Sequence, residues 1–254
     1  MGSTEVFRFE RKYLVTEPAA DSIQQFVTTS LELDEHMAGA DSVGYRVCSL
    51  YLDTPHLSLY RQSNEGIKNR RKLRIRFYDY RTDGVAFLEI KKRTGETVHK
   101  LRASVEKSCC DALLRGERLR ASQLCGGDDI GCRTLDEFCD YKQAYDADGV
   151  VFVDYRRIAY VSRADNTRVT FDRHLAARHY SPSLGISPAE SATPVAVRGV
   201  VLELKYNGRA PRWMHDLVRT FNVQRCSFPK YVYCVDALNL AATHRNALAG
   251  SVSQ

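Results

Sequence analysis

Alternating apolar and basic residues in the segment KLRIRFYDY, from Lys72 to Tyr80, constrain the fold of this chain more than any other feature. Successive side chains of an extended strand point to opposite faces, so this segment predicts a strand with one apolar and one strongly basic face. The apolar face carries Leu73, Ile75 and Phe77. The opposite face carries Lys72, Arg74, Arg76 and Tyr78. A fold for this chain must bury the first face and accommodate the charge of the second.

A second segment of the same kind, FLEIKKR from Phe87 to Arg93, follows after a short gap. The gap contains Thr82, Asp83 and Gly84, a sequence typical of a hairpin turn. Leu88 and Ile90 share one face of this second strand. The opposite face is formed by Phe87, Glu89, Lys91 and Arg93. Paired antiparallel, the two strands would carry a ladder of Arg, Lys and Glu side chains on one surface.

The same periodicity predicts about eight strands in all, with helices at both ends and in the middle of the chain. The other strands are expected at Val6–Val15, Tyr45–Asp53, Val98–Val105, Val150–Val161, Arg168–Arg173 and Val200–Tyr206. Helices are expected from the N-cap Thr16 to about Thr29, in patches between Lys107 and Tyr145, at Pro211–Phe221, and from Tyr231 to about Ala247. We expect Leu57–Lys68 to be irregular and Tyr180–Pro194 to be a loop. No internal repeat is present, and at 254 residues the chain could form one large domain or two small ones.

Two arrangements explain strands with one charged face. In an open sheet the charged face meets water, and no function is needed to explain it. In a closed antiparallel barrel whose apolar outer face is covered by helices, the charges point inward. The second arrangement explains better why the charged positions are so often Arg or Lys, strand after strand. We therefore predict an α+β fold built on an eight-stranded antiparallel barrel, with helices over its apolar outside.

Ten basic residues and three carboxylates would then meet inside the barrel. The basic residues are Arg8, Lys12, Lys72, Arg74, Arg76, Lys91, Arg93, Lys100, Arg102 and Lys205. This excess is too large for a small monoanion and suits polyphosphate or a nucleoside triphosphate, whose oxygens match Arg forks and Lys ammonium groups. Glu203 is the carboxylate that we expect to bind a divalent cation. For Glu10 and Glu89, a salt bridge to a neighbouring Arg is an equally good explanation.

Composition narrows the function without naming it. The net charge of +6 and the isoelectric point near 8.9 favour anionic partners, and the excess of Arg over Lys suits phosphate, although codon usage would also explain it. No P-loop, G-x-S-x-G elbow or H-E-x-x-H motif is present, and no cysteines have zinc-site spacing. No run reaches the roughly 20 apolar residues of a membrane span. A cytoplasmic protein that does not bind nucleic acid is expected.

Nine short motifs, in order, resemble the catalytic domain of the vacuolar transporter chaperone (VTC) polyphosphate polymerases. They are ERKYLV, SLYLDT, KLRIR, FLEIK, HKLR, YRRIAY, VTFD, LELKY and FPKY, and they run from about Phe7 to Ala237. That domain belongs to the triphosphate tunnel metalloenzyme superfamily, together with the CYTH phosphatases. The resemblance implies an eight-stranded antiparallel tunnel that makes inorganic polyphosphate from ATP with Mn²⁺ or Mg²⁺. This chain resembles a stand-alone bacterial-type member, which implies a single domain over residues 1–254, with 238–254 as a C-terminal helix and tail.

The resemblance also assigns roles to individual residues. It places Lys12, Arg74, Arg76, Lys91, Lys100 and Arg157 in the catalytic set. With the inward charges above, the expected substrate-binding residues are Arg8, Arg93, Arg102, Tyr155, Arg168, Lys205 and Lys230. The metal-binding glutamate falls on Glu203, the carboxylate already chosen.

The last motif departs from the family pattern, which reads Lys-x-Ser-Lys-Tyr. Ser227 stands in place of the first lysine and Pro229 in place of the serine, while Lys230 is kept and Arg225 could restore the lost charge. Three functions therefore stay open: a polyphosphate polymerase, a triphosphate or nucleoside-triphosphate hydrolase, and a polyphosphate-binding module without turnover. The acceptor, the preferred metal, the oligomeric state and a membrane partner stay open as well.

Overall fold

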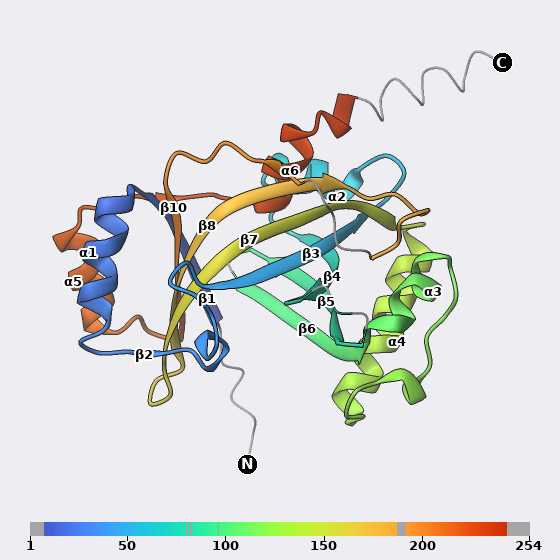
Figure 1. Cartoon of the computed structure of the whole chain (residues 1–254), viewed down its shortest axis with the longest axis horizontal. Helices are drawn as coiled ribbons and strands as arrows, with labels where there is room; N and C mark the ends of the chain where they lie inside the picture. Colours follow the sequence, from blue (N-terminus) through green and yellow to red (C-terminus); the bar gives the residue numbers. More distant parts are fainter. Residues whose placement is uncertain (1–7, 80, 82, 96, 187–191, 243–254) are drawn as a thin grey trace.

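A single, strongly curved antiparallel sheet forms the centre of the molecule in the computed structural model, which describes residues 8–79, 81, 83–95, 97–186 and 192–242 (Figure 1). Eight long strands follow one another across it in the order β1-β10-β8-β7-β3-β4-β5-β6. Their bounds are β1 Arg8–Val15, β10 Val200–Asn207, β8 Thr167–His179, β7 Asp148–Ser162, β3 Tyr45–Asp53, β4 Arg70–Phe77, β5 Val85–Thr94 and β6 Thr97–Glu106. Three short strands join them: β2 Glu32–Leu33, β9 Thr193–Pro194 and β11 Arg225–Cys226.

The predicted closure of eight strands into a barrel is not confirmed. The sheet has 11 strands and its hydrogen-bonded path is open, because β11 pairs with the outer edge of β1 and, within the described residues, β6 pairs with no strand except β5. The sheet nevertheless curls far enough for its two ends to meet through side chains. Lys91 on β5 lies 3.4 Å from Glu10 on β1, although five strands separate β5 from β1 in the sheet. The charged inner face therefore surrounds an enclosed space without a continuous ladder.

Helices cover the convex face in two groups, which lie at opposite ends of the curved sheet in Figure 1. The first group is α1 (Glu17–Val27) and α5 (Arg212–Thr220), over β1, β10 and β8. The second is α3 (Cys110–Leu114) and α4 (Asp129–Ala144), over β3 to β6. The hydroxyl of Thr16 caps α1 by accepting from the amide of Ala19, as predicted.

The alternation in β4 divides between the two faces as the sequence predicts. Leu73, Ile75 and Phe77 are fully buried in the core under α4, while Arg74 and Arg76 are 7% exposed on the concave side. An apolar outer face buried under helices is the main stabilising feature, because buried aliphatic and aromatic side chains each contribute about 1.5–3 kcal/mol. The concave face is left to the charged residues.

One end of the concave face is filled by α2 (Ser58–Asn64) and α6 (Lys230–Ala237). The expectation that 57–68 is irregular is wrong, because Asp53 at the end of β3 organises this segment. Its carboxylate accepts hydrogen bonds from the amides of Leu59 and Tyr60, at 2.8 and 2.7 Å, and from the hydroxyl of Tyr231, at 2.7 Å. Asp53 thus joins β3 to both helices and fixes the position of Lys230 beside the inner face.

Within the described residues, no helix has both the length and the apolar character needed to cross a membrane. Most of the predicted C-terminal helix and tail, and the first two residues of the predicted Val6–Val15 strand, lie outside the part of the chain that the structure describes.

Candidate functional site

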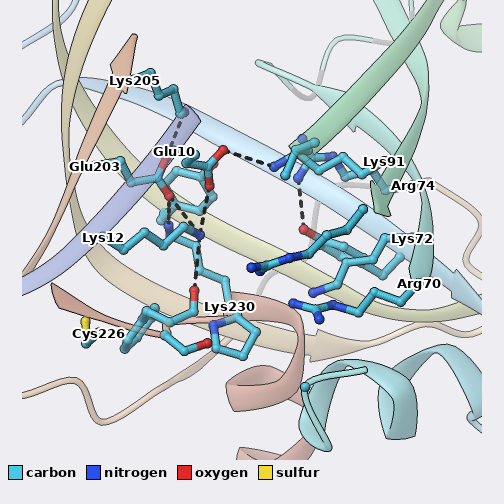
Figure 2. Close-up of a pocket in the computed structure, with 18 of the residues that line it drawn as sticks. Glu10, Lys12, Arg70, Lys72, Arg74, Lys91, Glu203, Lys205, Cys226 and Lys230 are labelled. Atoms are coloured by element: carbon cyan, nitrogen blue, oxygen red, sulfur yellow. Dashed lines mark hydrogen bonds and ion pairs between the residues drawn. The ribbon is translucent and has the colours of Figure 1, made fainter. Parts of the chain in front are cut away.

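The concave face encloses a cavity of about 540 Å³ with an excess of positive charge (Figure 2). Eleven of its lining residues are Lys or Arg and two are Glu. The basic residues are Lys12, Arg70, Lys72, Arg74, Arg76, Lys91, Arg93, Arg157, Lys205, Arg225 and Lys230. The acidic residues are Glu10 and Glu203. Figure 2 shows Arg70, Lys72 and Arg74 projecting from one wall toward Lys12 on the facing wall.

The register between β4 and β5 concentrates this charge. Arg70 stands opposite Arg93 and Lys72 opposite Lys91, whereas Arg74 stands opposite Glu89. Like charges directly opposite each other on one face destabilise a sheet. Only the third of these rows contains its own counter-charge, so the first two rows favour an anion bound in the cavity.

Glu89 neutralises one cluster of cations on the inner face. Its side chain is fully buried and accepts from Arg74 Nε at 2.7 Å, with Lys100 Nζ at 2.5 Å and Arg102 Nε at 2.7 Å on its other oxygen. Burial alone would raise the pKa of this carboxyl, but the surrounding cations, Arg74 first among them, hold the pKa well below its usual range. Glu89 is therefore ionised and fixes the orientation of Arg74.

Glu203 and Asp172 neutralise a second cluster on β8 and β10. Glu203 contacts the ammonium groups of Lys12, Lys205 and Lys230 at 3.2, 2.7 and 3.1 Å. Asp172 receives two hydrogen bonds from the Arg157 fork, at 2.6 and 2.7 Å, and contacts Lys230 at 2.6 Å. These cations outweigh burial and keep the pKa of Glu203 well below its usual range.

Lys72 is one of the cavity's basic residues that pair with no carboxylate in the described part of the chain, and it lies among other cations. Among the described residues it has no hydrogen bond or ion pair to a carboxylate, and its neighbours are the cations Lys12, Lys91, Arg70 and Arg74. Burial and then repulsion from these cations hold the pKa of Lys72 well below its usual range. An anion in the cavity would relieve this repulsion.

The structure brings most of the predicted site residues together around the cavity. Those that line it are Lys12, Arg74, Arg76, Lys91, Arg93, Tyr155, Arg157, Lys205, Lys230 and Glu203. Lys100 and Arg102 instead reach Glu89 from β6. Arg168 turns away to the hydroxyl of Tyr45 and to Asp34, both at 3.0 Å. The side chain of Arg8 lies outside the part of the chain that the structure describes.

Three residues of the site were not predicted. Arg70 precedes Lys72 by two positions, so strand alternation could have extended the basic face to it. Asp172 shares a face with Arg168 in the strand RVTFD and could have been found in the same way. Tyr51, whose hydroxyl accepts from Arg74 at 2.9 Å, gave no signal because it reads as one apolar residue among several.

The described residues do not fit a resident metal ion. They contain no cluster of three or more His, Cys, Asp or Glu side chains that could hold one. Both oxygens of Glu203 are already engaged: Oε1 faces Lys12 and Lys230, and Oε2 faces Lys205 and Arg157. Glu203, which we expected to bind a metal ion, is therefore a single carboxylate surrounded by cations.

Comparison with curated proteins gave no match. Among solved structures, a putative adenylate cyclase from Vibrio parahaemolyticus aligns with a TM-score of 0.47 and 13% identity, over 89% of this chain and 97% of that one. A putative adenylate cyclase from Bacillus halodurans gives a TM-score of 0.46 and 13% identity, over 88% of this chain and 94% of that one. The model of the VTC domain matches residues 7–239, nearly the whole sequence. The chain therefore belongs to the VTC domain family.

Proposed function

We propose that this chain transfers the terminal phosphoryl group of ATP to the end of an inorganic polyphosphate chain held in the basic cavity. The observation that supports this most directly is the lining of eleven cations and two carboxylates around about 540 Å³. Every phosphate unit of a polyphosphate chain carries anionic oxygens, which Arg forks and Lys ammonium groups bind well. Membership of the VTC family and the motifs shared with its polymerases agree with this activity.

Phosphoryl transfer requires mainly positioning and charge neutralisation, because the protein need not supply a nucleophile. The chain holds three guanidinium groups ready for this. Arg74 is oriented by Glu89, Arg157 by Asp172, and Arg76 by the hydroxyls of Ser49 and Tyr155 at 3.1 and 3.3 Å. Such fixed donors need no reorganisation as charge develops on the transferred group.

In the proposed reaction, an oxygen at the end of the polyphosphate chain attacks the terminal phosphorus of ATP, and the bond from that phosphorus to the bridging oxygen breaks. ADP leaves with that oxygen, and the chain grows by one phosphate. The resemblance also implies Mn²⁺ or Mg²⁺, which would supply further charge neutralisation when bound with the nucleotide. We assign no protein ligand set to this ion.

Incubation with ATP and Mn²⁺ or Mg²⁺, followed by electrophoresis for long polyphosphate and an assay for free phosphate, tests the proposal. Long polyphosphate is the expected product. Arg74→Gln should abolish its formation, while Arg212→Ala, at a side chain 96% exposed on α5, should not change it. Free phosphate without polymer would identify a triphosphate hydrolase instead.

A polyphosphate-binding module without turnover is the second candidate, and the altered last motif of the sequence favours it. Ser227 and Pro229, which replace a lysine and a serine of the family motif, both line the cavity. Arg225 lines it too and supplies a cation near the position where one was lost. Tight binding of polyphosphate by calorimetry, with neither polymer nor free phosphate formed from ATP, would identify this function.

A further inference from the structure

A group of aromatic rings lies beside the basic cavity, next to residues that line it but outside the lining itself. This group, the aromatic end, consists of His36, Tyr45, Tyr78 and Phe87. The ring centroids of His36 lie 5.8 and 5.5 Å from those of Tyr45 and Tyr78, and Tyr78 lies 5.8 Å from Phe87. Tyr45 lies on β3, Phe87 on β5, Tyr78 directly after β4, and His36 in the short 3₁₀ helix Glu35–Met37, so the fold assembles the rings from distant parts of the sequence.

The strand register places these rings directly beside the cavity. Phe87 on β5 stands opposite Arg76 on β4, and Tyr45 on β3 stands opposite Arg157 on β7. Arg76 and Arg157 both line the cavity. The aromatic end is therefore one cross-strand step from two of the guanidinium groups proposed to bind phosphate. The basic rows that contain Arg70 and Arg93 lie farther along the same strands, on the other side of Arg74.

Cations hold the rings in place from outside the cavity lining. Arg102 donates to the hydroxyl of Tyr78 at 3.3 Å and lies 4.3 Å from the centroid of Phe87. Arg168 donates to the hydroxyl of Tyr45 at 3.0 Å. These contacts give Arg102 and Arg168 a role in positioning the rings.

The rings are ordered without being sealed in the core. Tyr45, Tyr78 and Phe87 are half-buried and His36 is exposed. The segment that carries His36 is anchored nonetheless, because the Asp34 amide donates to the carbonyl of Ala159 at 2.9 Å and its carboxylate pairs with Arg168 at 3.0 Å. Accessible, fixed rings beside a phosphate-binding cavity suit a ligand that joins an aromatic ring to a polyanion.

We propose that the aromatic end stacks the base of a nucleoside triphosphate whose phosphates lie in the cavity. This inference rests on the proposed function, since it needs the cavity to bind a triphosphate. Inorganic polyphosphate has no group that would use these rings, whereas every nucleobase presents a planar π-face to them. The triphosphate would point from Arg76 and Arg157 toward the rows of Arg70 with Arg93 and of Lys72 with Lys91, and these rows would hold the polyphosphate chain.

Paired titrations of ATP and inorganic tripolyphosphate into the same protein test this assignment by calorimetry. Loss of a stacking ring should lower the affinity for ATP by about tenfold, as is typical of base–aromatic contacts. The affinity for tripolyphosphate should stay within about twofold of the wild-type value. His36→Ala and Tyr78→Ala should both show this selective loss, and His36→Ala removes only an exposed ring, so its fold is safe. Tyr78→Phe keeps the ring and should preserve the ratio of the two affinities.

The two ligands separate the possible failures. If both bind the wild type and the ratio is unchanged in His36→Ala and Tyr78→Ala, or if each variant weakens both ligands equally, the rings only pack beside the cavity and this inference is overturned alone. If neither ligand binds the wild type, the proposed function fails and this inference fails with it.

Discussion

Replacement of Glu89 by Gln tests how far the inner face depends on its few carboxylates. The Glu89 side chain is fully buried and neutralises Arg74, Lys100 and Arg102. Removing one partner of a buried ion pair typically costs 3–5 kcal/mol, because the other charge stays buried and unpaired. The side chain of Arg74 is only 8% exposed, whereas the side chains of Lys100 and Arg102 are each 33% exposed and partly hydrated, so we count Arg74 alone. The free energy of unfolding should therefore fall by about 3 kcal/mol, and the Tm by about 6–12 °C for a chain of this size.

Urea unfolding at pH 7 measures this change, with Glu117→Gln as the matched control. Glu117 is 64% exposed and pairs with Arg115, which is 67% exposed, so its loss should stay within about 0.5 kcal/mol. A loss below about 1 kcal/mol in Glu89→Gln would refute the reasoning, because it would mean that water already solvates the cluster.

The pH dependence of the same variant provides an independent check. The pKa of Glu89 is lower in the folded than in the unfolded protein, so its stabilisation is complete above the unfolded value of about 4.3 and disappears as the pH falls through the folded value. The difference between wild type and variant should therefore shrink in acid. A difference that stays constant down to the acid limit of folding would contradict the ionised state of Glu89.

Three further predictions concern the cavity. Burial and the surrounding cations lower the pKa of Lys72, so the protein should take up protons when tripolyphosphate binds, and binding should weaken as the pH rises toward about 10.4. Lys72→Arg, which stays charged, should reduce this pH dependence in calorimetry, and the remainder should come from Lys205, whose pKa is lowered to about 8 in the same lining. Arg225→Ala should weaken polyphosphate binding several-fold at low salt while Arg212→Ala does not, because Arg225 lines the cavity and Arg212 is 96% exposed elsewhere; equal effects would contradict this. Ser227→Lys adds a cation to the lining and should tighten polyphosphate binding in the same assay, with a steeper dependence on salt.

Strand alternation predicts the two faces of the sheet because the polarity of each side chain decides whether it is buried under the helices or faces the cavity. The apolar residues of β4 are buried under α4, and the basic residues between them face the cavity, as their spacing indicates. Helix α1 is predictable for the same local reason, since Thr16 caps its own helix. The open path of the sheet was not predictable. It depends on β11, a two-residue strand that pairs with β1 from more than 200 positions away in the sequence.

Local patterns also missed α2, because its first turn is organised by a residue outside it. Asp53 belongs to β3, yet its carboxylate accepts from the amides at the start of α2 and from Tyr231 on α6. Leu57 enters the helix with a left-handed φ of 54°, a conformation that disfavours a helix start in any propensity-based prediction. Tertiary contacts outweigh the local preference here.

Lys72 and Arg74 show what separates the orientation of a charge from its function. They lie two positions apart on one face of one strand, and the sequence gives no reason to treat them differently. The register with β5 sets Arg74 against Glu89 and Lys72 against Lys91, so the first is neutralised and the second is not. A neutralised, hydrogen-bonded guanidinium is fixed in place before a ligand arrives, while an unpaired ammonium among cations gains most from an anion. The cavity thus combines fixed guanidinium donors at Arg74, Arg76 and Arg157 with a region of uncompensated charge at Lys72, and this division is a property of strand pairing.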